Sequence, residues 1–214
     1  TVRRNNIEVT ASHRFCNAAP VTIAIYYGMQ SMFEGETHVL TPGGAYTDWT
    51  EVAKASTFTK QEHPLFRRYV EKNRQGYQST WLLPDGLGDH ALLDGQDDIF
   101  IYAPYGKSYH KLIGNKRMEN GDKTCWRGVY TWFETPIADD ADLLCYEGSV
   151  GGHTAVFIDC KRACKRTLAL PGYLDLRHFG TAEQNSGIRI SAAGRNKLKI
   201  KAGAPGSCVL LLRE

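Results

Sequence analysis

The chain has 214 residues, which is the length of one ordinary domain, and a formal net charge of only +3. Apolar residues make up 42% and charged residues 23% of the chain, which excludes a disordered, collagen-like or coiled-coil protein. No run of about 18 apolar residues occurs, so the sequence contains no candidate for a membrane-spanning helix. The small net charge does not by itself indicate a nucleic-acid-binding protein.

Alternating and β-branched residues predict extended strands in the first part of the chain. In the segment VTIAIYY, aliphatic side chains at every second position share one face of a strand. Pro20 suits the start of a strand, and the sequence TPGG at 41–44 has strong turn chemistry. The strands predicted in this part are 7–16, 21–27 and 37–40.

The one helix that the sequence predicts covers residues 64–75. Pro64 suits the first turn of a helix, and Gly76 is a natural stop after its last turn. The charged residues between them would face solvent, as on an ordinary amphipathic helix packed on a sheet. The apolar residues that would share the buried face are Leu65, Phe66, Tyr69 and Val70.

After residue 84 we expect a Gly- and Asp-rich loop, a polar, turn-rich segment at 107–123, and many short strands separated by Gly or Pro turns. Such spacing is typical of β-sandwiches and barrels. We therefore predict a mostly β fold, an antiparallel β-sandwich with one accessory helix, in a single domain of residues 1–214. The only sign of a domain boundary is weak and lies near 136–141. The strands predicted in this part are 99–103, 124–134, 143–146, 154–158, 167–170, 174–176, 187–191, 196–201 and 207–212.

Six cysteines are spread over the chain without a Cys-x-x-Cys pair. Because zinc sites use closely spaced ligand pairs, this spacing does not indicate a zinc site. A scattered, even set is typical of disulfides in an oxidising compartment, and buried free thiols of a cytosolic protein are the alternative. The first residue is Thr1, which indicates removal of either a leader or an initiator Met, and a removed leader agrees with the cysteines. We therefore expect an extracellular, periplasmic or cell-envelope protein. The disulfide candidates, whose pairing stays open, are Cys16, Cys125, Cys145, Cys160, Cys164 and Cys208.

Four pieces of the N-terminal part resemble recurring segments of an uncharacterised bacterial family, the "domain of unknown function" ten thirty-six. They are HRFCNAAPVTIAIYYG, GETHVLTPGG, IFIYA and TCWRGVYTWFET. The resemblance covers residues 7–136, within which 50–95 look inserted. It implies that Cys16 and Cys125 are the family cysteines and that the protein belongs to the cell envelope or is exported. Arg127 departs from the family pattern by following Cys125 after two residues rather than three. The family implies no activity.

One pair of residues could carry catalysis. A cysteine nucleophile needs a nearby histidine to form its thiolate. The Gly-Gly-His sequence that enters an apolar strand at 151–158 resembles a piece of papain-like amidases, which would make Cys125 the nucleophile and His153 the base. The short separation between the two residues and the helix-weakening Gly128 argue against this assignment. A Cys-His hydrolase is therefore an alternative and not the leading prediction.

Two groups of residues are candidates for binding. Lys197, Lys199 and Lys201 alternate with aliphatic residues, which places three ammonium groups on one face of a strand. They would either contact an anionic partner or protect an edge strand from aggregation. Tyr105 and Tyr109 follow Pro104 in a polar segment and should be exposed for recognition. The acidic residues of the loop at 85–98 do not have calcium-loop spacing, so we predict no metal and no cofactor.

These observations favour a non-enzymatic function, because no motif combines the residues and the spacing that catalysis needs. We predict an exported, disulfide-stabilised β-sandwich module that acts by binding or by self-assembly. Its partner would be another copy of the chain, added strand to strand in a homo-oligomer or filament, or an envelope ligand that includes an anionic surface. No specific nucleic-acid recognition is predicted. The second alternative, after the hydrolase, is a membrane-active, toxin-like protein.

Overall fold

The structure is a computed structural model that describes residues 2–3, 5–32, 36–42, 46–51, 56–59, 67–83, 98–103, 107–184 and 187–212. For 2–3, 56–59 and 98–103 it describes the backbone alone. Every regular element among these residues is a strand, and all strand pairs are antiparallel within four sheets, A to D. The predicted mostly β, antiparallel fold is therefore confirmed. Four sheets are more than a simple sandwich contains. No described helix is long and apolar enough to cross a membrane.

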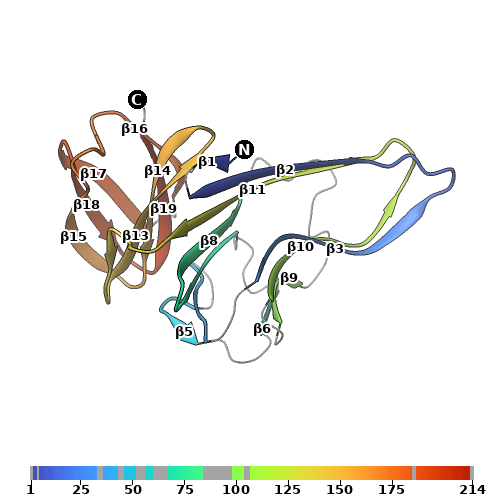
Figure 1. The fold of residues 1–214 in the computed structure, drawn as a ribbon, viewed down its shortest axis with the longest axis horizontal. Coiled ribbons are helices and arrows are strands. Elements are labelled where there is room, and N and C mark those ends of the chain that lie inside the picture. The colour runs from blue at the N-terminus through green and yellow to red at the C-terminus, as the bar shows by residue number, and fades with distance from the viewer. Residues whose placement is uncertain are drawn as a thin grey trace.

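Sheet A, with seven strands, occupies the middle of the molecule (Figure 1). One of its faces packs on sheet C through residues such as Val70 and Val129. The other face packs on sheet B around Met29 and Trp126. Both faces of sheet A are thus buried over much of their area. In spatial order its strands are β1 (Val2–Arg3), β2 (Asn6–Arg14), β11 (Lys123–Phe133), β8 (Gly76–Leu82), β7 (Arg68–Asn73), β4 (His38–Leu40) and β5 (Thr50–Glu51).

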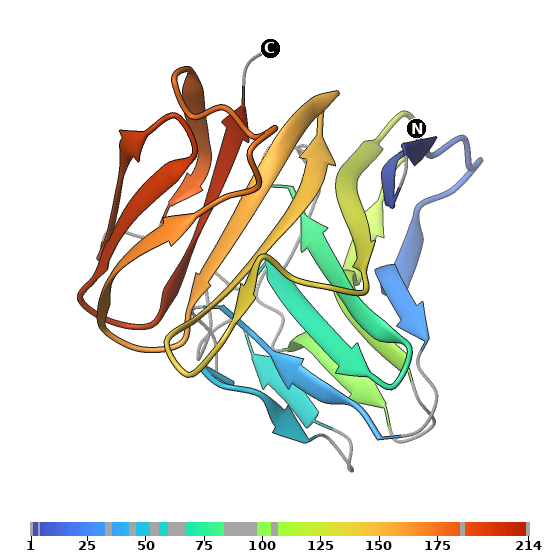
Figure 2. The ribbon, with the colours of Figure 1, turned by 60° about the vertical axis from the view of Figure 1, so that its left-hand side comes forward.

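Sheets C and D form the C-terminal end of the molecule, beside the green strands of sheet A in Figure 2. In β13, alternate residues serve two cores: Leu143 and Cys145 pack toward sheet D, and Leu144 and Tyr146 toward sheet A. This explains why the sheet C strands at 143–150, 153–160 and 206–212 contain nearly continuous apolar runs. Sheet C contains β12 (Ala138–Asp139), β13 (Leu143–Val150), β14 (His153–Cys160), β19 (Gly206–Leu212) and β16 (Phe179–Gln184), and sheet D contains β15 (Cys164–Ala169), β18 (Lys197–Ala202) and β17 (Ile188–Gly194).

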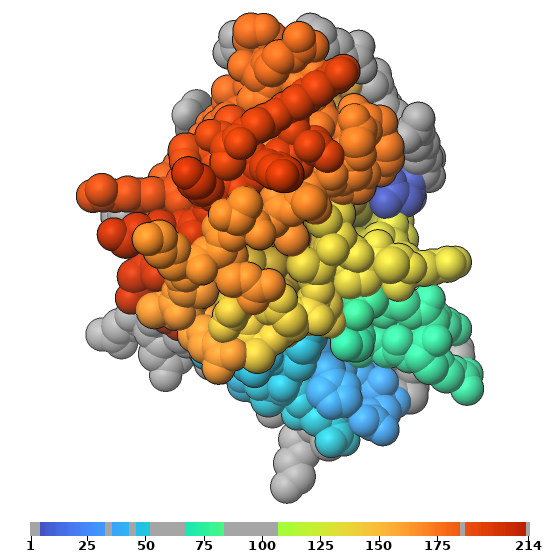
Figure 3. Space-filling model, turned by 90° about the vertical axis from the view of Figure 1, so that its left-hand side faces the viewer, coloured from blue at the N-terminus to red at the C-terminus, as the bar shows by residue number. Residues whose placement is uncertain are grey.

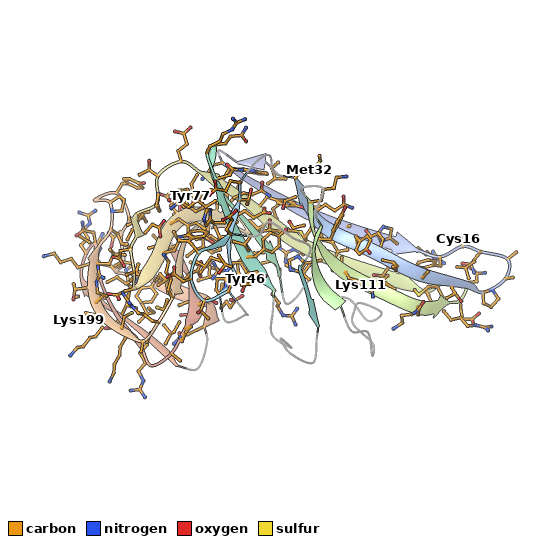
Figure 4. All side chains as sticks on the ribbon, turned by 90° about the horizontal axis from the view of Figure 1, so that it is seen from below. Cys16, Met32, Tyr46, Tyr77, Lys111 and Lys199 are labelled. Atoms are coloured by element: carbon orange, nitrogen blue, oxygen red, sulfur yellow. The ribbon has the colours of Figure 1, made fainter. Side chains whose placement is uncertain are left out.

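A long arm leads away from this body toward the opposite end (Figure 1). It is built from two antiparallel ribbons, β2 with β11 and β3 with β10, which enclose a small apolar core that includes Leu112 and Trp126. Cys16 lies at the tip of the arm (Figure 4). Sheet B, which supplies one of the two ribbons, consists of β3 (Val21–Met32), β10 (Lys107–Met118), β9 (Asp98–Ala103) and β6 (Ser56–Thr59).

The helix predicted over 64–75 is wrong. Residues 68–73 form strand β7, which pairs with β8 in a hairpin, and 64–66 lie outside the described residues. Gly76, expected to end a helix, lies at the hairpin turn with a φ of 128°. Arg68 and Glu71 are buried on opposite faces of the strand rather than facing solvent. Their burial between sheets hides the alternation that normally marks a strand.

Two further predictions differ from the structure. Residues 107–118, expected to be polar and turn-rich, form the long strand β10 because β3 and β9 pair with its two sides. Residues 174–176, expected as a strand, have no regular structure, although Leu174 and Leu176 are buried in the core of sheets C and D. Apolar side chains can thus be buried from a segment that pairs with no other strand.

Candidate binding surface

Strand β18, which carries Lys197, Lys199 and Lys201, lies at the end of the molecule farthest from the arm. Lys199 is labelled there in Figure 4. In β18, Leu198 and Ile200 are buried against sheet C, and the alternate lysines are exposed, as the sequence predicts. However, β18 is the central strand of sheet D and not an edge strand. Protection of a sheet edge therefore does not explain these lysines.

The neighbouring strands extend the lysines of β18 into a basic face. Lys201 lies opposite Lys165 of β15 on one side and Arg189 of β17 on the other. Directly opposed side chains in antiparallel strands are about 5 Å apart at Cβ, and like charges at this distance destabilise the sheet. Lys199 lies between the hydroxyl-bearing Thr167 and Ser191. We use the term basic face for Lys165, Thr167, Arg189, Ser191, Lys197, Lys199 and Lys201.

The basic face is hollowed, with a cavity of about 580 Å³ lined by residues of all three strands. Figure 3 views the molecule from this end, where orange and red residues fill most of the surface. No described carboxylate forms an ion pair with the lysines of the basic face or with Arg189. Five cationic groups therefore share one surface without a counter-ion from the described part of the chain.

Nearby cations that point elsewhere are neutralised. Arg166, whose neighbours in β15 belong to the basic face, donates to Asp140 and Asp142 at 2.9 and 2.7 Å. The buried Lys161 bonds to Asp139 at 2.9 Å, and Arg162 bonds to Asp142. Cations around sheet D are therefore paired with carboxylates, whereas the cations of the basic face are not paired with any described carboxylate.

The two tyrosines predicted as exposed binding residues do not form a surface. Tyr109 is only 8% exposed and packs against Tyr27, with ring centroids 4.9 Å apart. Its exposure is thus wrongly predicted, because β10 is a covered strand and not a loop. Tyr105 lies outside the described residues, as does the acidic loop at 84–97.

All six cysteines are free thiols in the structure, so the predicted disulfide framework is absent from it. Cys16 is exposed at the tip of the arm. Three of the others, Cys145, Cys160 and Cys208, are buried in the core between sheets C and D. Burial raises the pKa of Cys160, and the adjacent Cys164 raises it further. The structure therefore does not support the inference of export, which depended on disulfides. The extracellular or envelope location stays a prediction.

The alternative catalytic pair is not joined by any described contact. Cys125 lies in the arm, opposite Ser12. His153 begins β14 and lines a cavity of about 450 Å³, where the residue of β11 that reaches it is Arg127 rather than Cys125. The hydrolase stays a prediction without a geometric observation behind it.

A buried polar cluster, which the sequence does not predict, lies between sheets A and B. The buried carboxyl of Glu71 accepts hydrogen bonds from Ser31 at 2.6 Å and from Ser108 at 3.2 Å. The hydroxyl of Tyr69 lies 2.8 Å from that of Ser108. Burial raises the pKa of Glu71 to about 7 against the lowering effect of the two serines, and burial lowers that of the nearby His110 to about 3. Groups whose pKa is strongly shifted by burial cluster at functional sites.

One group of side chains in the described part of the chain could contact a metal ion together. The ligand atoms of Glu36, His38 and Glu51 lie within 4.8 Å of one another on the small hairpin of β4 and β5. Both glutamates are exposed, and exposed acidic groups commonly gather without a metal. The trio therefore does not by itself assign a metal site.

Comparisons with known proteins found no matching family model, curated protein or solved structure. The resemblance of residues 7–136 to an uncharacterised bacterial family accordingly stays a prediction.

Proposed function

We propose that the protein is a binding module, not an enzyme, and that its basic face binds an acidic polysaccharide. The observation that carries the proposal is the alignment of Lys165, Lys201 and Arg189 across three strands without a described counter-ion. Holding like charges side by side costs stability, and an anionic ligand would offset that cost.

The chemistry of the basic face favours a chain of anionic sugars. Ammonium groups repeat about every 7 Å along β18, because alternate residues of a strand share a face. Thr167 and Ser191 add hydroxyls that can bond to sugar oxygens. Such a face can contact several carboxylate or sulfate groups of one polymer at the same time.

Two other anionic partners fit the basic face less well. Single-stranded nucleic acids are bound by stacking their bases on aromatic rings, and no large exposed apolar or aromatic side chain lies on the described strands of sheet D. Membrane-binding surfaces usually insert such side chains between the lipids. A hollow lined by cations also contacts a chain better than a flat bilayer.

Binding of heparin, polygalacturonate and double-stranded DNA to the full chain tests the proposal. We expect the two polysaccharides to bind with an affinity that falls as salt rises, because charge pairs at a surface are screened. The double variant Lys199→Glu/Lys201→Glu should weaken that binding by at least about tenfold, or 1.4 kcal/mol.

A matched control separates the basic face from net charge. Arg74→Glu/Lys123→Glu changes the charge of the protein by the same amount at exposed residues outside sheet D. It should leave polysaccharide binding nearly unchanged. An equal loss in both double variants, or tighter binding of DNA than of either polysaccharide at the same salt, would contradict the proposal.

Self-assembly is a second candidate function, favoured by a different observation. Strand β3 is an edge of sheet B, and no described strand pairs with its outer side. Val21 and Ile25 of this strand are 41% and 51% exposed. A long edge strand with exposed aliphatic side chains is a template for pairing with another chain.

A further inference from the structure

A third cavity, remote in sequence from the basic face, opens where sheet B ends above sheet A. Its volume is about 700 Å³, and Met32 and Tyr77, labelled in Figure 4, are among its lining residues. Among the lining residues, Trp132 presents an aromatic ring on this face of sheet A together with four side-chain amides, whereas the rings of Tyr77 and Phe133 stack on each other on the opposite face. None of the lining residues is a lysine or arginine. This composition is opposite to that of the basic face and would repel an anionic ligand.

The floor of the cavity is a row of side chains across three strands of sheet A. Glu71 of β7 lies opposite Gln78 of β8, and Gln78 lies opposite Trp132 of β11. These three side chains share one face of the sheet because they occupy directly opposed positions. Asn5 continues the row, since its amide donates to the carbonyl of Trp132 at 2.7 Å.

Trp132 is held in place with part of its ring accessible. Its indole nitrogen donates to the amide oxygen of Gln78 at 3.0 Å, and its ring stacks on Tyr130 with 18° between the planes. The side chain nevertheless remains 39% exposed. A large aromatic ring that is fixed and still open to solvent is unusual in a core and typical of recognition surfaces.

The polar groups around the ring retain hydrogen-bonding capacity. The bond from Trp132 uses the oxygen of Gln78, which leaves the two amide hydrogens as donors for a ligand. The exposed carboxyl of Glu134, which also lines the cavity, supplies acceptor positions, whereas that of Glu71 is buried and bonded to Ser31 and Ser108. Aromatic face, amide donors and carboxyl acceptor thus meet in one cavity of ligand size.

We propose that this cavity binds a neutral saccharide, with Trp132 against the apolar face of a sugar ring and Gln78 and Glu134 bonded to its hydroxyls. The absence of lining cations disfavours anionic sugars, and the amides provide the donors that neutral hydroxyls accept. The proposal is independent of the basic face, which has different residues and a ligand of opposite character.

Titration of the full chain with neutral cello-, manno- and N-acetylchito-oligosaccharides tests the proposal, with calorimetry and tryptophan fluorescence as readouts. We expect at least one series to bind and Trp132→Ala to lower its affinity by roughly tenfold or more. Trp132→Phe should retain part of the affinity, because it keeps a stacking ring but loses the bond to Gln78. Gln78→Leu, which preserves the size of the side chain, should also weaken binding.

Three controls define the contrary outcomes. Tyr173→Ala removes another exposed aromatic ring and should leave binding unchanged, as should Lys199→Glu/Lys201→Glu in the basic face. Thermal unfolding of each variant confirms that it folds, and Gln78→Leu serves if Trp132→Ala does not. The proposal fails if no neutral oligosaccharide binds at about 10 mM, or if Trp132→Ala and Gln78→Leu both bind normally. It also fails if tetramethylammonium binds there in preference to every sugar, since Trp132 and Glu134 would then form a cation site.

Discussion

Two buried charged residues of β7 are stabilised in different ways on the two faces of sheet A. Arg68 forms a two-pronged ion pair with the buried Asp159 of sheet C and also donates to Tyr146 at 2.9 Å. Glu71, on the other face, has only hydroxyls around its carboxyl. The first arrangement satisfies a charge with an opposite charge. The second leaves a carboxyl whose ionisation is opposed by burial.

The protein should become less stable as Glu71 ionises. Burial raises its pKa from 4.5 to about 7, so the folded state holds this proton more tightly than the unfolded state. The resulting stabilisation is complete below pH 4.5 and is lost as the pH rises through 7, and amounts to about 3 kcal/mol. In Glu71→Gln, which cannot ionise, this contribution is absent. His110 does not add to the effect in this range, because burial lowers its pKa to about 3.

Denaturant unfolding of both proteins at several pH values between 4.5 and 8 measures the effect. The difference in free energy of unfolding between wild type and Glu71→Gln should change steadily over this range, in the direction that disfavours the wild type at high pH. Parallel curves for the two proteins would show that the pKa of Glu71 is not raised in the folded state.

At the scale of single residues, the sequence predicts the lysines of β18 well and the charged residues of β7 poorly. Lys197, Lys199 and Lys201 alternate with buried aliphatic residues, and this local period reports their exposure directly. Arg68 and Glu71 are buried because partners distant in sequence, Asp159 and Ser31, neutralise or bond them. Glu71 and Trp132 likewise share a cavity only through strand pairing, which no local pattern reports.

At the scale of elements, the arm requires two ribbons to approach closely. Gly128 of β11 lies against Met29 of β3, where a Cβ atom would be 1.9 Å from the sulfur of Met29. Met29 is buried and has a φ of 52°, an uncommon value for a residue with a side chain. The glycine therefore provides the space in which the bent strand β3 packs on sheet A.

Gly128→Ala should lower the free energy of unfolding by about 1–3 kcal/mol, because an added methyl group must displace a buried side chain. Gly180→Ala in β16 is the matched control, since nothing lies within 4 Å of the Cβ position there. Urea unfolding of the two variants measures the difference. Equal stability of both variants would show that Met29 moves aside without cost.

Whether a strand can be predicted from the sequence depends on how that strand is stabilised in the fold. Strands β13, β14 and β19 of sheet C are visible in the sequence because their apolar runs are buried on both faces, whereas β12 and β16 of the same sheet have no such run and are not predicted. Strand β10 is not, because its polar residues 115–117 pair with β3 in the arm and partly face solvent. Strand β7 falls in the predicted helix at 64–75 because Gly76, at the turn that follows the strand, fits a helix end equally well.

At the scale of the whole molecule, different surface chemistries occupy different places. The basic face lies at one end, near Lys199, and the arm with Cys16 at its tip extends to the other (Figure 4). The saccharide cavity lies on sheet A, where sheet B ends. Such separation would allow a module to hold ligands at its body while the arm contacts another molecule.

The exposed edge of the arm predicts that the chain associates with itself. Pairing of β3 with β3 of a second copy would be self-complementary about a two-fold axis, would satisfy backbone groups and would cover Val21 and Ile25. The wild-type protein should therefore change from monomer to dimer as its concentration rises in sedimentation equilibrium. Ile25→Lys should shift that equilibrium strongly toward monomer, because a charged side chain on an edge strand opposes pairing. Tyr173→Lys adds the same charge at another exposed position and should dimerise like the wild type. A wild-type chain that stays monomeric at every concentration, or an equal effect of the two lysines, would contradict assembly through β3.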